Sequence, residues 1–223
     1  MSEPTRILVT GVPHSGTSIL RKLIGNHPDV WDVSTECICI RSRPKGFTNE
    51  KAFVCKVTTV YKTWPEGYLI VGVYRDIHDI LLGMEERGLD TTYEEFRREY
   101  IKQNTRLLEH AATKDNVIVV RYESLFDSEH TVLKRVFGFC GLSFFPEIVT
   151  ENHLRKALIN RGEIQDEEPP RTSHEDFRTW QINSPFKQCG GRWKTEMSQE
   201  LKDKIRDDKE MLDFLAKLGY EQA

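Results

Sequence analysis

The chain has 223 residues and a mass of 26.0 kDa, enough for one α/β domain with a buried core and too few for two ordinary domains joined by a linker. Lys and Arg number 32 against 35 Asp and Glu, and the net charge of −3 excludes the broad positive field that sequence-independent nucleic-acid binding needs. Mean hydropathy is −0.53 and no apolar run approaches the ~20 residues of a membrane helix, so we predict no membrane span. We expect a single domain over residues 1–223.

The expected compartment is the cytoplasm. Residues 1–6 enter an apolar run directly and lack the basic, apolar and small-residue regions of a secretory signal. The five cysteines are odd in number and irregularly spaced, which argues against a disulfide framework. Both features are typical of a protein that works in a reducing environment.

Short apolar runs of β-forming residues predict parallel strands buried on both faces, at 7–9, 52–57, 68–74 and 117–120. Helical periodicity predicts helices at 17–25, 77–87, 93–112 and 130–140. A last helix is predicted to begin at Ser198 and to carry on one face Leu201, Ile205, Leu212 and Leu215. The alternation of strand and helix predicts an α/β fold, a three-layer domain of the P-loop type with a central parallel sheet flanked by helices. Residues 160–194 show no clear element and are predicted to form a lid over the site.

A glycine-containing turn joins the first strand to the first helix. Residues 11–18 are G-V-P-H-S-G-T-S, which has the G-x-x-x-x-G spacing of a phosphate-binding loop in the strand-to-helix position of such a loop. The amides of residues 15–18 and the positive end of the helix dipole would converge on one phosphate, with the hydroxyls of Thr17 and Ser18 as further donors. Thr17 stands where nucleotide hydrolases have a lysine, so the lysine that usually binds the β- and γ-phosphates of ATP or GTP is missing. The alternative is a β–α turn that binds no ligand.

The chain resembles the sulfotransferases that use 3′-phosphoadenosine 5′-phosphosulfate (PAPS) as sulfuryl donor. The segments that carry this likeness are PHSGTS (13–18), RDIHD (75–79), VRYESL (120–125), WQIN (180–183), GRWK (191–194) and LGY (218–220). The bacterial and tyrosylprotein types are more similar to it than the cytosolic type. The resemblance implies binding of PAPS and of the product 3′-phosphoadenosine 5′-phosphate (PAP), without a metal ion. The nucleotide-binding residues that it implies are Pro13, His14, Ser15, Gly16, Thr17, Ser18, Arg75, Tyr122, Lys187 and Arg192.

Arg75 follows a predicted strand, and the resemblance implies that it holds the 3′-phosphate, a role that suits its permanent charge and forked donors. Tyr122 would lie near the adenine, with ordinary packing as the alternative. The chain departs from the family pattern at three positions. His14 replaces a Lys or Arg of the loop, Gly83 replaces a serine that donates to the 3′-phosphate, and Thr58 replaces the histidine base of cytosolic members.

Sulfuryl transfer needs a base for the proton of the acceptor and positive charge near the bridging oxygen. Lys56 lies near the end of a predicted strand and matches the lysine that lies near the sulfuryl group in the family. Glu36 lies close to the position of the glutamate base of the bacterial and tyrosylprotein types. The resemblance therefore implies Lys56, Glu36 and His14 as catalytic residues, with His14 and His78 as alternative bases.

Three functions stay open at this point. The first is a sulfotransferase that acts on a hydroxyl or amine of a small-molecule, glycan or peptide acceptor. The second is a P-loop kinase of small molecules, which would explain the glycine turn and the lid. The third is a catalytically degenerate protein that still binds the sulfonucleotide, motivated by His14, Thr58 and Gly83. The sequence indicates neither the acceptor nor the oligomeric state.

Overall fold

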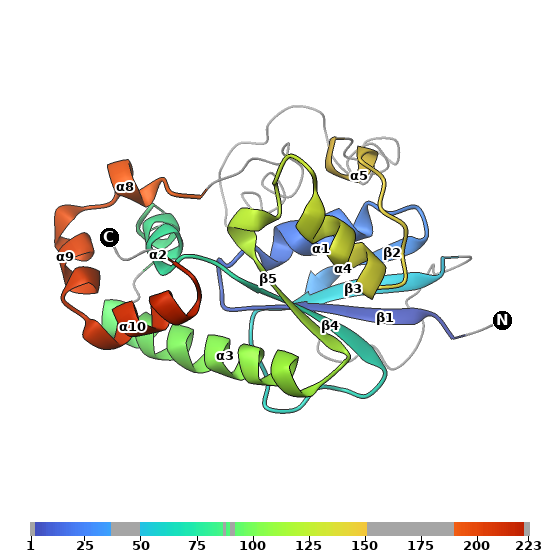
Figure 1. Ribbon diagram of the computed structural model, residues 1–223, viewed down its shortest axis with the longest axis horizontal. Helices are drawn as coiled ribbons and strands as arrows, with labels where there is room; N and C mark the ends of the chain where they lie inside the picture. The colour runs from blue at the N-terminus through green and yellow to red at the C-terminus, as the bar shows by residue number, and fades with distance from the viewer. Residues whose placement is uncertain (1–2, 37–49, 87, 90–91, 151–189, 221–223) are drawn as a thin grey trace.

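In the described part of the chain, residues 3–36, 50–86, 88–89, 92–150 and 190–220, the computed structural model has a central sheet of five parallel strands. The strands are β1 (Thr5–Thr10), β2 (Val30–Glu36), β3 (Ala52–Val57), β4 (Tyr68–Tyr74) and β5 (Val117–Arg121). Their order is β2-β3-β1-β4-β5, so β1 lies in the middle, between β3 and β4 (Figure 1). The prediction of an α/β fold with a central parallel sheet is confirmed.

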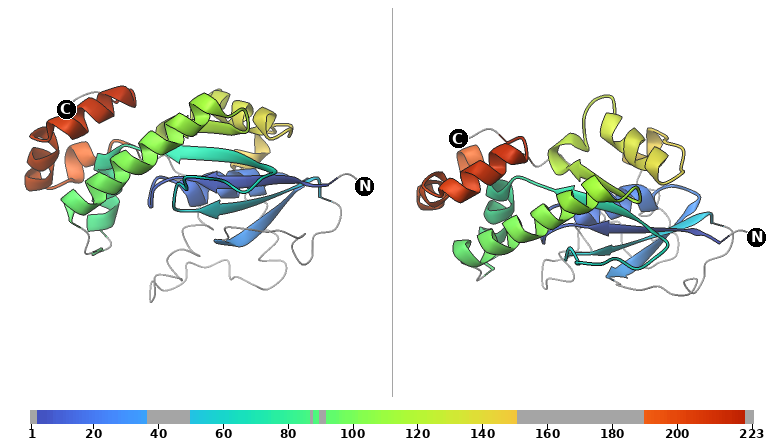
Figure 2. Two further views of the ribbon diagram at one scale, coloured as in Figure 1. Left: turned by 90° about the horizontal axis from the view of Figure 1, so that it is seen from below. Right: turned by 60° about the horizontal axis from the view of Figure 1, so that its bottom comes forward.

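Helices cover both faces of this sheet. They include α1 (Thr17–Gly25), α2 (Ile77–Glu85), α3 (Tyr93–Thr113), α4 (Thr131–Phe139), the short α5 (Glu147–Thr150) and the 3₁₀ turn η1 (Tyr122–Ser124). On one face α1 and α4 pack on the strands, and Leu20 of α1 shares an apolar cluster with Val9 of β1. On the other face runs α3, whose Leu107 side chain lies against Gly72 of β4 (Figure 2). Burial from both sides explains why the strands are nearly continuous apolar runs.

The C-terminal helices lie together at one end of the sheet, beside α2 and the beginning of α3 (Figure 1). They are α8 (Trp193–Glu196), α9 (Gln199–Arg206) and α10 (Lys209–Lys217). The single helix predicted from Ser198 is therefore wrong, because the chain turns at Asp207 and Asp208. The Asp208 carboxylate accepts a hydrogen bond from the Met211 amide (3.0 Å) and also pairs with Arg97 of α3, so a helix cap forms inside the predicted run.

Strand β2 has no counterpart among the predicted elements. It pairs with β3 at the edge of the sheet, and its residue Asp32 forms a buried ion pair with Arg21 of α1 (Asp32 Oδ1 to Arg21 Nε, 3.1 Å). Burial raises the pKa of Asp32, whereas the positive charge of Arg21 lowers it. An acidic residue whose burial depends on a partner from another element gives no apolar pattern in the sequence. Glu36 is the last residue of this strand.

The remaining predicted strands and helices agree with the structure to within two residues at each end. The predicted lid, residues 160–194, lies outside the described residues apart from 190–194. Among the helices that the structure describes, none is long and apolar enough to cross a lipid bilayer.

Candidate functional site

The loop between β1 and α1 occupies the middle of the edge at which all five described strands end. This edge is where parallel α/β sheets bind their ligands. Within the loop, the Ser15 amide donates to the Val12 carbonyl oxygen (3.2 Å), and His14 adopts a left-handed conformation with φ of 65°. The loop is thus a compact turn at the position that the glycine spacing predicts. The Ser15 amide, predicted from the sequence to point at the anion together with those of residues 16–18, is bonded to Val12 instead.

The N-terminus of α1 presents amides and no negative charge. Gly16 is the N-cap and offers no side chain to the amides of the first turn, which also contains no acidic residue. The first amides of a helix have no partner within the helix, and they carry the positive end of its dipole. An anion above Gly16, Thr17 and Ser18 would satisfy these donors.

Both glycines of the loop are required by close packing. A Cβ at Gly11 would collide with the Val73 carbonyl oxygen of β4. A Cβ at Gly16 would come within 2.6 Å of Cε2 of Tyr122. The Tyr122 ring is 1% exposed and lies beneath the loop, which favours the packing alternative for this residue over direct contact with a nucleotide base.

One cationic residue lies on each side of β1: Lys56 within β3, and Arg75 directly after β4. Lys56 belongs to β3, is 4% exposed, and is the register partner of Val9. Side chains alternate along a strand, so Lys56 shares the sheet face of Val54, on which α1 packs. Arg75 follows β4 directly; its Nη1 donates to the His14 carbonyl oxygen (3.5 Å), and its guanidinium lies 4.5 Å from the centre of the Tyr122 ring. The predicted loop, lysine and arginine therefore meet at one edge of the sheet.

Glu36 ends β2 and is the register partner of Lys56. The backbone therefore brings the predicted base and the predicted cation onto neighbouring strands. This proximity depends on β2, the strand that the sequence pattern did not indicate.

His78 has a packing role in the structure. Its buried ring stacks on Trp193 of α8 (centroids 4.1 Å apart), and its Nδ1 lies 2.7 Å from Oδ1 of Asp76. The same carboxylate accepts the His78 amide (3.0 Å) and is the N-cap of α2. Asp76 thus pairs with His78, whose ring is enclosed between α2 and α8.

Arg192 is engaged by carboxylates. Its guanidinium pairs with Glu86, just after α2, and with Glu196 in the next turn of α8. Both carboxylates raise the pKa of Arg192 above its ordinary value. The structure therefore places the Arg192 charge in an ion-pair cluster, whereas the predicted Lys187 lies outside the described residues.

Asp79 and Glu123 are two buried or half-buried carboxylates that the sequence analysis assigned no role. Asp79 accepts hydrogen bonds from the amides of Gly191 (2.6 Å) and Trp193 (3.3 Å), and thereby ties α8 to α2. Burial raises its pKa, which these amides and the charge of Arg75 lower in part. Asp79 is the last residue of the RDIHD segment and Glu123 belongs to VRYESL, so both signals were present within the segments that carry the family likeness.

The described groups suit a ligand with separated anionic groups. Helix amides, a lysine on one side and an arginine on the other offer donors and positive charge. This donor set fits a nucleotide with a 5′-phosphosulfate and a 3′-phosphate. Among the described residues, no group of three or more His, Cys, Asp or Glu side chains is arranged to hold a metal ion; that the site works without a metal stays a prediction.

Comparison with solved structures shows which fold this is. The sulfotransferase domain of the Synechococcus PCC 7002 olefin synthase superposes with a TM-score of 0.66 at 11% identity, over 100% of this chain and 98% of that domain. Mouse sulfotransferase SULT7A1 complexed with PAP gives 0.59 at 15% identity, over 97% of this chain and 90% of that one. Retinol dehydratase complexed with retinol and PAP gives 0.56 at 14% identity, over 96% and 82%.

Neither a protein-family model nor a curated protein sequence matches the chain. The solved structures nevertheless show that the chain shares the fold of sulfotransferases, at low sequence identity.

Proposed function

We propose that this protein is a sulfotransferase that moves the sulfuryl group of PAPS to a hydroxyl or amine acceptor. The observation that carries the proposal is the loop between β1 and α1, where the N-terminus of α1 has no acidic residue or side-chain cap, flanked by Lys56 on β3 and by Arg75 after β4. Its fold is that of sulfotransferases, and two of the similar structures, SULT7A1 and retinol dehydratase, are complexes with PAP.

Each component of the edge has a separate task in this proposal. The amides of Gly16, Thr17 and Ser18, together with the hydroxyls of Thr17 and Ser18, would hold the 5′-phosphosulfate. Arg75 would hold the 3′-phosphate, because its guanidinium is directed by the His14 carbonyl and the Tyr122 ring. PAPS supplies an activated sulfuryl group on a phosphate leaving group. Lys56 would place positive charge beside the bridging oxygen at which negative charge develops.

We further propose that Glu36 is the base that takes the proton of the acceptor. Its backbone is aligned with that of Lys56, at the same edge as the loop. His14, within the loop itself, is the alternative base, whereas the stacked and enclosed ring of His78 disfavours that residue. Binding of the nucleotide by Lys187 and Arg192 is retained as a proposal. For Arg192 it requires the ion pairs with Glu86 and Glu196 to open.

Calorimetric titration tests the nucleotide assignment. We expect PAP to bind with micromolar affinity and ATP with Mg²⁺ to bind much more weakly. Arg75→Ala should weaken PAP binding by about 10- to 100-fold, the range for the loss of a charge-assisted hydrogen bond. Arg98→Ala, which removes an exposed arginine of α3, is the matched control and should leave binding unchanged. A preference for ATP would overturn the nucleotide assignment in favour of a P-loop kinase. An Arg75→Ala variant that binds PAP like the wild type would overturn the assignment of Arg75 to the 3′-phosphate.

Turnover tests the transfer step. Release of PAP from PAPS is followed with a panel of phenols, alcohols and amines as acceptors. Glu36→Gln should lower kcat by roughly 10²- to 10⁴-fold with unchanged PAP affinity, because the amide cannot accept the acceptor proton. Full turnover by this variant would shift the role of base to His14. Tight PAP binding without transfer to any acceptor would instead support the catalytically degenerate protein.

A further inference from the structure

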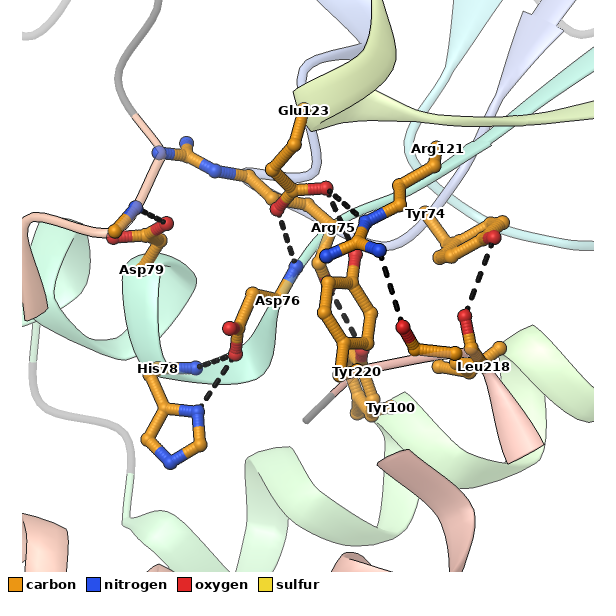
Figure 3. Close-up of polar contacts among 12 residues, drawn as sticks. Tyr74, Arg75, Asp76, His78, Asp79, Tyr100, Arg121, Glu123, Leu218 and Tyr220 are labelled. Carbon is orange, nitrogen blue, oxygen red and sulfur yellow. Dashed lines mark hydrogen bonds and ion pairs between the residues drawn. The ribbon is translucent and has the colours of Figure 1, made fainter. Parts of the chain in front are cut away.

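The turn that carries Arg75 is held by side chains from distant parts of the chain (Figure 3). The hydroxyl of Tyr100, which is buried in α3, donates to the Arg75 carbonyl oxygen (2.7 Å). The next amide, that of Asp76, donates to Oε1 of Glu123 (2.9 Å), which follows β5. Both polar groups of the peptide that leaves Arg75 are therefore bonded to side chains instead of solvent.

The second oxygen of Glu123 faces the C-terminal end of the described chain. Oε2 accepts hydrogen bonds from Nε of Arg121 (3.2 Å) and from the Tyr220 hydroxyl (2.9 Å). The Arg121 guanidinium lies 3.9 Å from the centre of the Tyr220 ring, and its Nη1 donates to the Gly219 carbonyl oxygen (3.2 Å) (Figure 3). Glu123 thus joins the Arg75 turn to Tyr220, which lies 97 positions after Glu123 in the chain.

We propose that Glu123 is a positioning residue for Arg75, and that Tyr220 of the LGY segment holds Glu123 in place, so that this C-terminal segment sets the affinity for the 3′-phosphate. The inference rests on the proposed function and deepens it, because it concerns the same phosphate site. The LGY segment marks the family likeness in the sequence, and the proposed chemistry leaves it without a role. Its contact with Glu123 supplies one.

A carboxylate is the group that this position requires. Glu123 accepts three donors: the Asp76 amide on one oxygen, and Arg121 and Tyr220 on the other. A glutamine has one acceptor oxygen, and its amino group would point at an N–H donor whichever way it turned. Burial and the neighbouring Glu123 raise the pKa of Tyr220 above its ordinary value, so its hydroxyl keeps the proton that it donates.

The experiment measures the affinity for PAP and for adenosine 5′-phosphosulfate, which lacks the 3′-phosphate, by calorimetry. Glu123→Gln should weaken PAP binding by about 10-fold and Tyr220→Phe by about 3-fold, because each removes hydrogen bonds of the chain that holds Arg75. Neither variant should change the affinity for adenosine 5′-phosphosulfate. Tyr74→Phe is the matched control, because the Tyr74 hydroxyl donates to the Leu218 carbonyl oxygen of the same segment (3.4 Å) and, among the described residues, makes no hydrogen bond to Glu123. Its PAP affinity should equal that of the wild type.

A double-mutant cycle separates positioning from general loosening. In a chain that already carries Arg75→Ala, Glu123→Gln should weaken PAP binding by less than about 2-fold, because a residue that acts through Arg75 has nothing left to position. Equal losses for both nucleotides, an unchanged PAP affinity of Glu123→Gln, or the full loss in the Arg75→Ala chain would each overturn the positioning role while the proposed function stands. A wild-type protein that fails to bind PAP would overturn the proposed function and this inference with it.

Discussion

Gly16→Ala is the substitution that most directly tests the packing beneath the loop. Gly16 has φ of 100°, a conformation that costs other residues about 1–2 kcal/mol. A Cβ at this position would overlap Cδ2 of Tyr122 and lie 2.6 Å from Cε2, so the ring must retreat by more than 0.8 Å for both atoms to reach the 3.4 Å at which ordinary contact begins. Tyr122 is 1% exposed, and its ring packs against both the Phe126 ring and the Arg75 guanidinium. The ring therefore cannot move away from the added Cβ without displacing other packed groups.

Overpacking of this kind costs about 1–3 kcal/mol, which together with the backbone strain gives a loss of about 2–5 kcal/mol in the free energy of unfolding. With a urea dependence of about 2 kcal/mol per molar, the denaturation midpoint should fall by about 1–2.5 M. Gly67→Ala is the matched control. Its φ is 77° and a Cβ there would meet no atom within 4 Å, so it carries the strain without the clash and should lose only about 0.5–1 M.

The assay is urea denaturation followed by circular dichroism, with PAP affinity measured on the folded variants. Tyr122→Leu in the Gly16→Ala chain should cost less than the sum of the two single substitutions, because the smaller side chain removes the clash. Equal midpoints for Gly16→Ala and Gly67→Ala would refute the reasoning, since they would mean that Tyr122 yields freely and does not define the floor of the loop.

Two further predictions concern stability. Asp79→Ala should lower the free energy of unfolding by about 1–3 kcal/mol in urea denaturation, because the Gly191 and Trp193 amides lose their acceptor. A loss no larger than that of Asp127→Ala, whose half-buried carboxylate accepts the Thr131 amide at the beginning of α4 (2.9 Å), would contradict it. His27 is buried, its Nδ1 accepts the Asp29 amide (3.0 Å), and burial lowers its pKa below 6.5. The unfolded chain therefore binds a proton at a pH where the folded chain does not, and stability should be complete above pH 6.5 and decline as the pH falls below it. Urea midpoints measured from pH 7.5 to 5 should fall less in His27→Asn, which keeps an acceptor and does not titrate; parallel profiles would refute the assignment.

Local patterns in the sequence determined most of the framework and part of the site. Hydrophobic runs and helical periodicity depend on neighbouring residues, and they located β3, β4 and α1 at their observed bounds. The glycine spacing determined the loop, and the position of Arg75 after a strand determined its place at the ligand-binding edge of the sheet. These features follow from backbone geometry and burial on both faces of a parallel sheet.

Only the tertiary structure decided which residues meet across long separations. In strand β2 the buried Asp32 pairs with Arg21 of α1, and the pairing of β2 with β3 brings the Glu36 backbone beside that of Lys56. The floor of the loop is Tyr122, and the Arg75 turn is held by Glu123 and the C-terminal Tyr220, contacts that no local period encodes. A buried carboxylate is stable only when its donors come from other elements, so its role appears once the chain has folded around it.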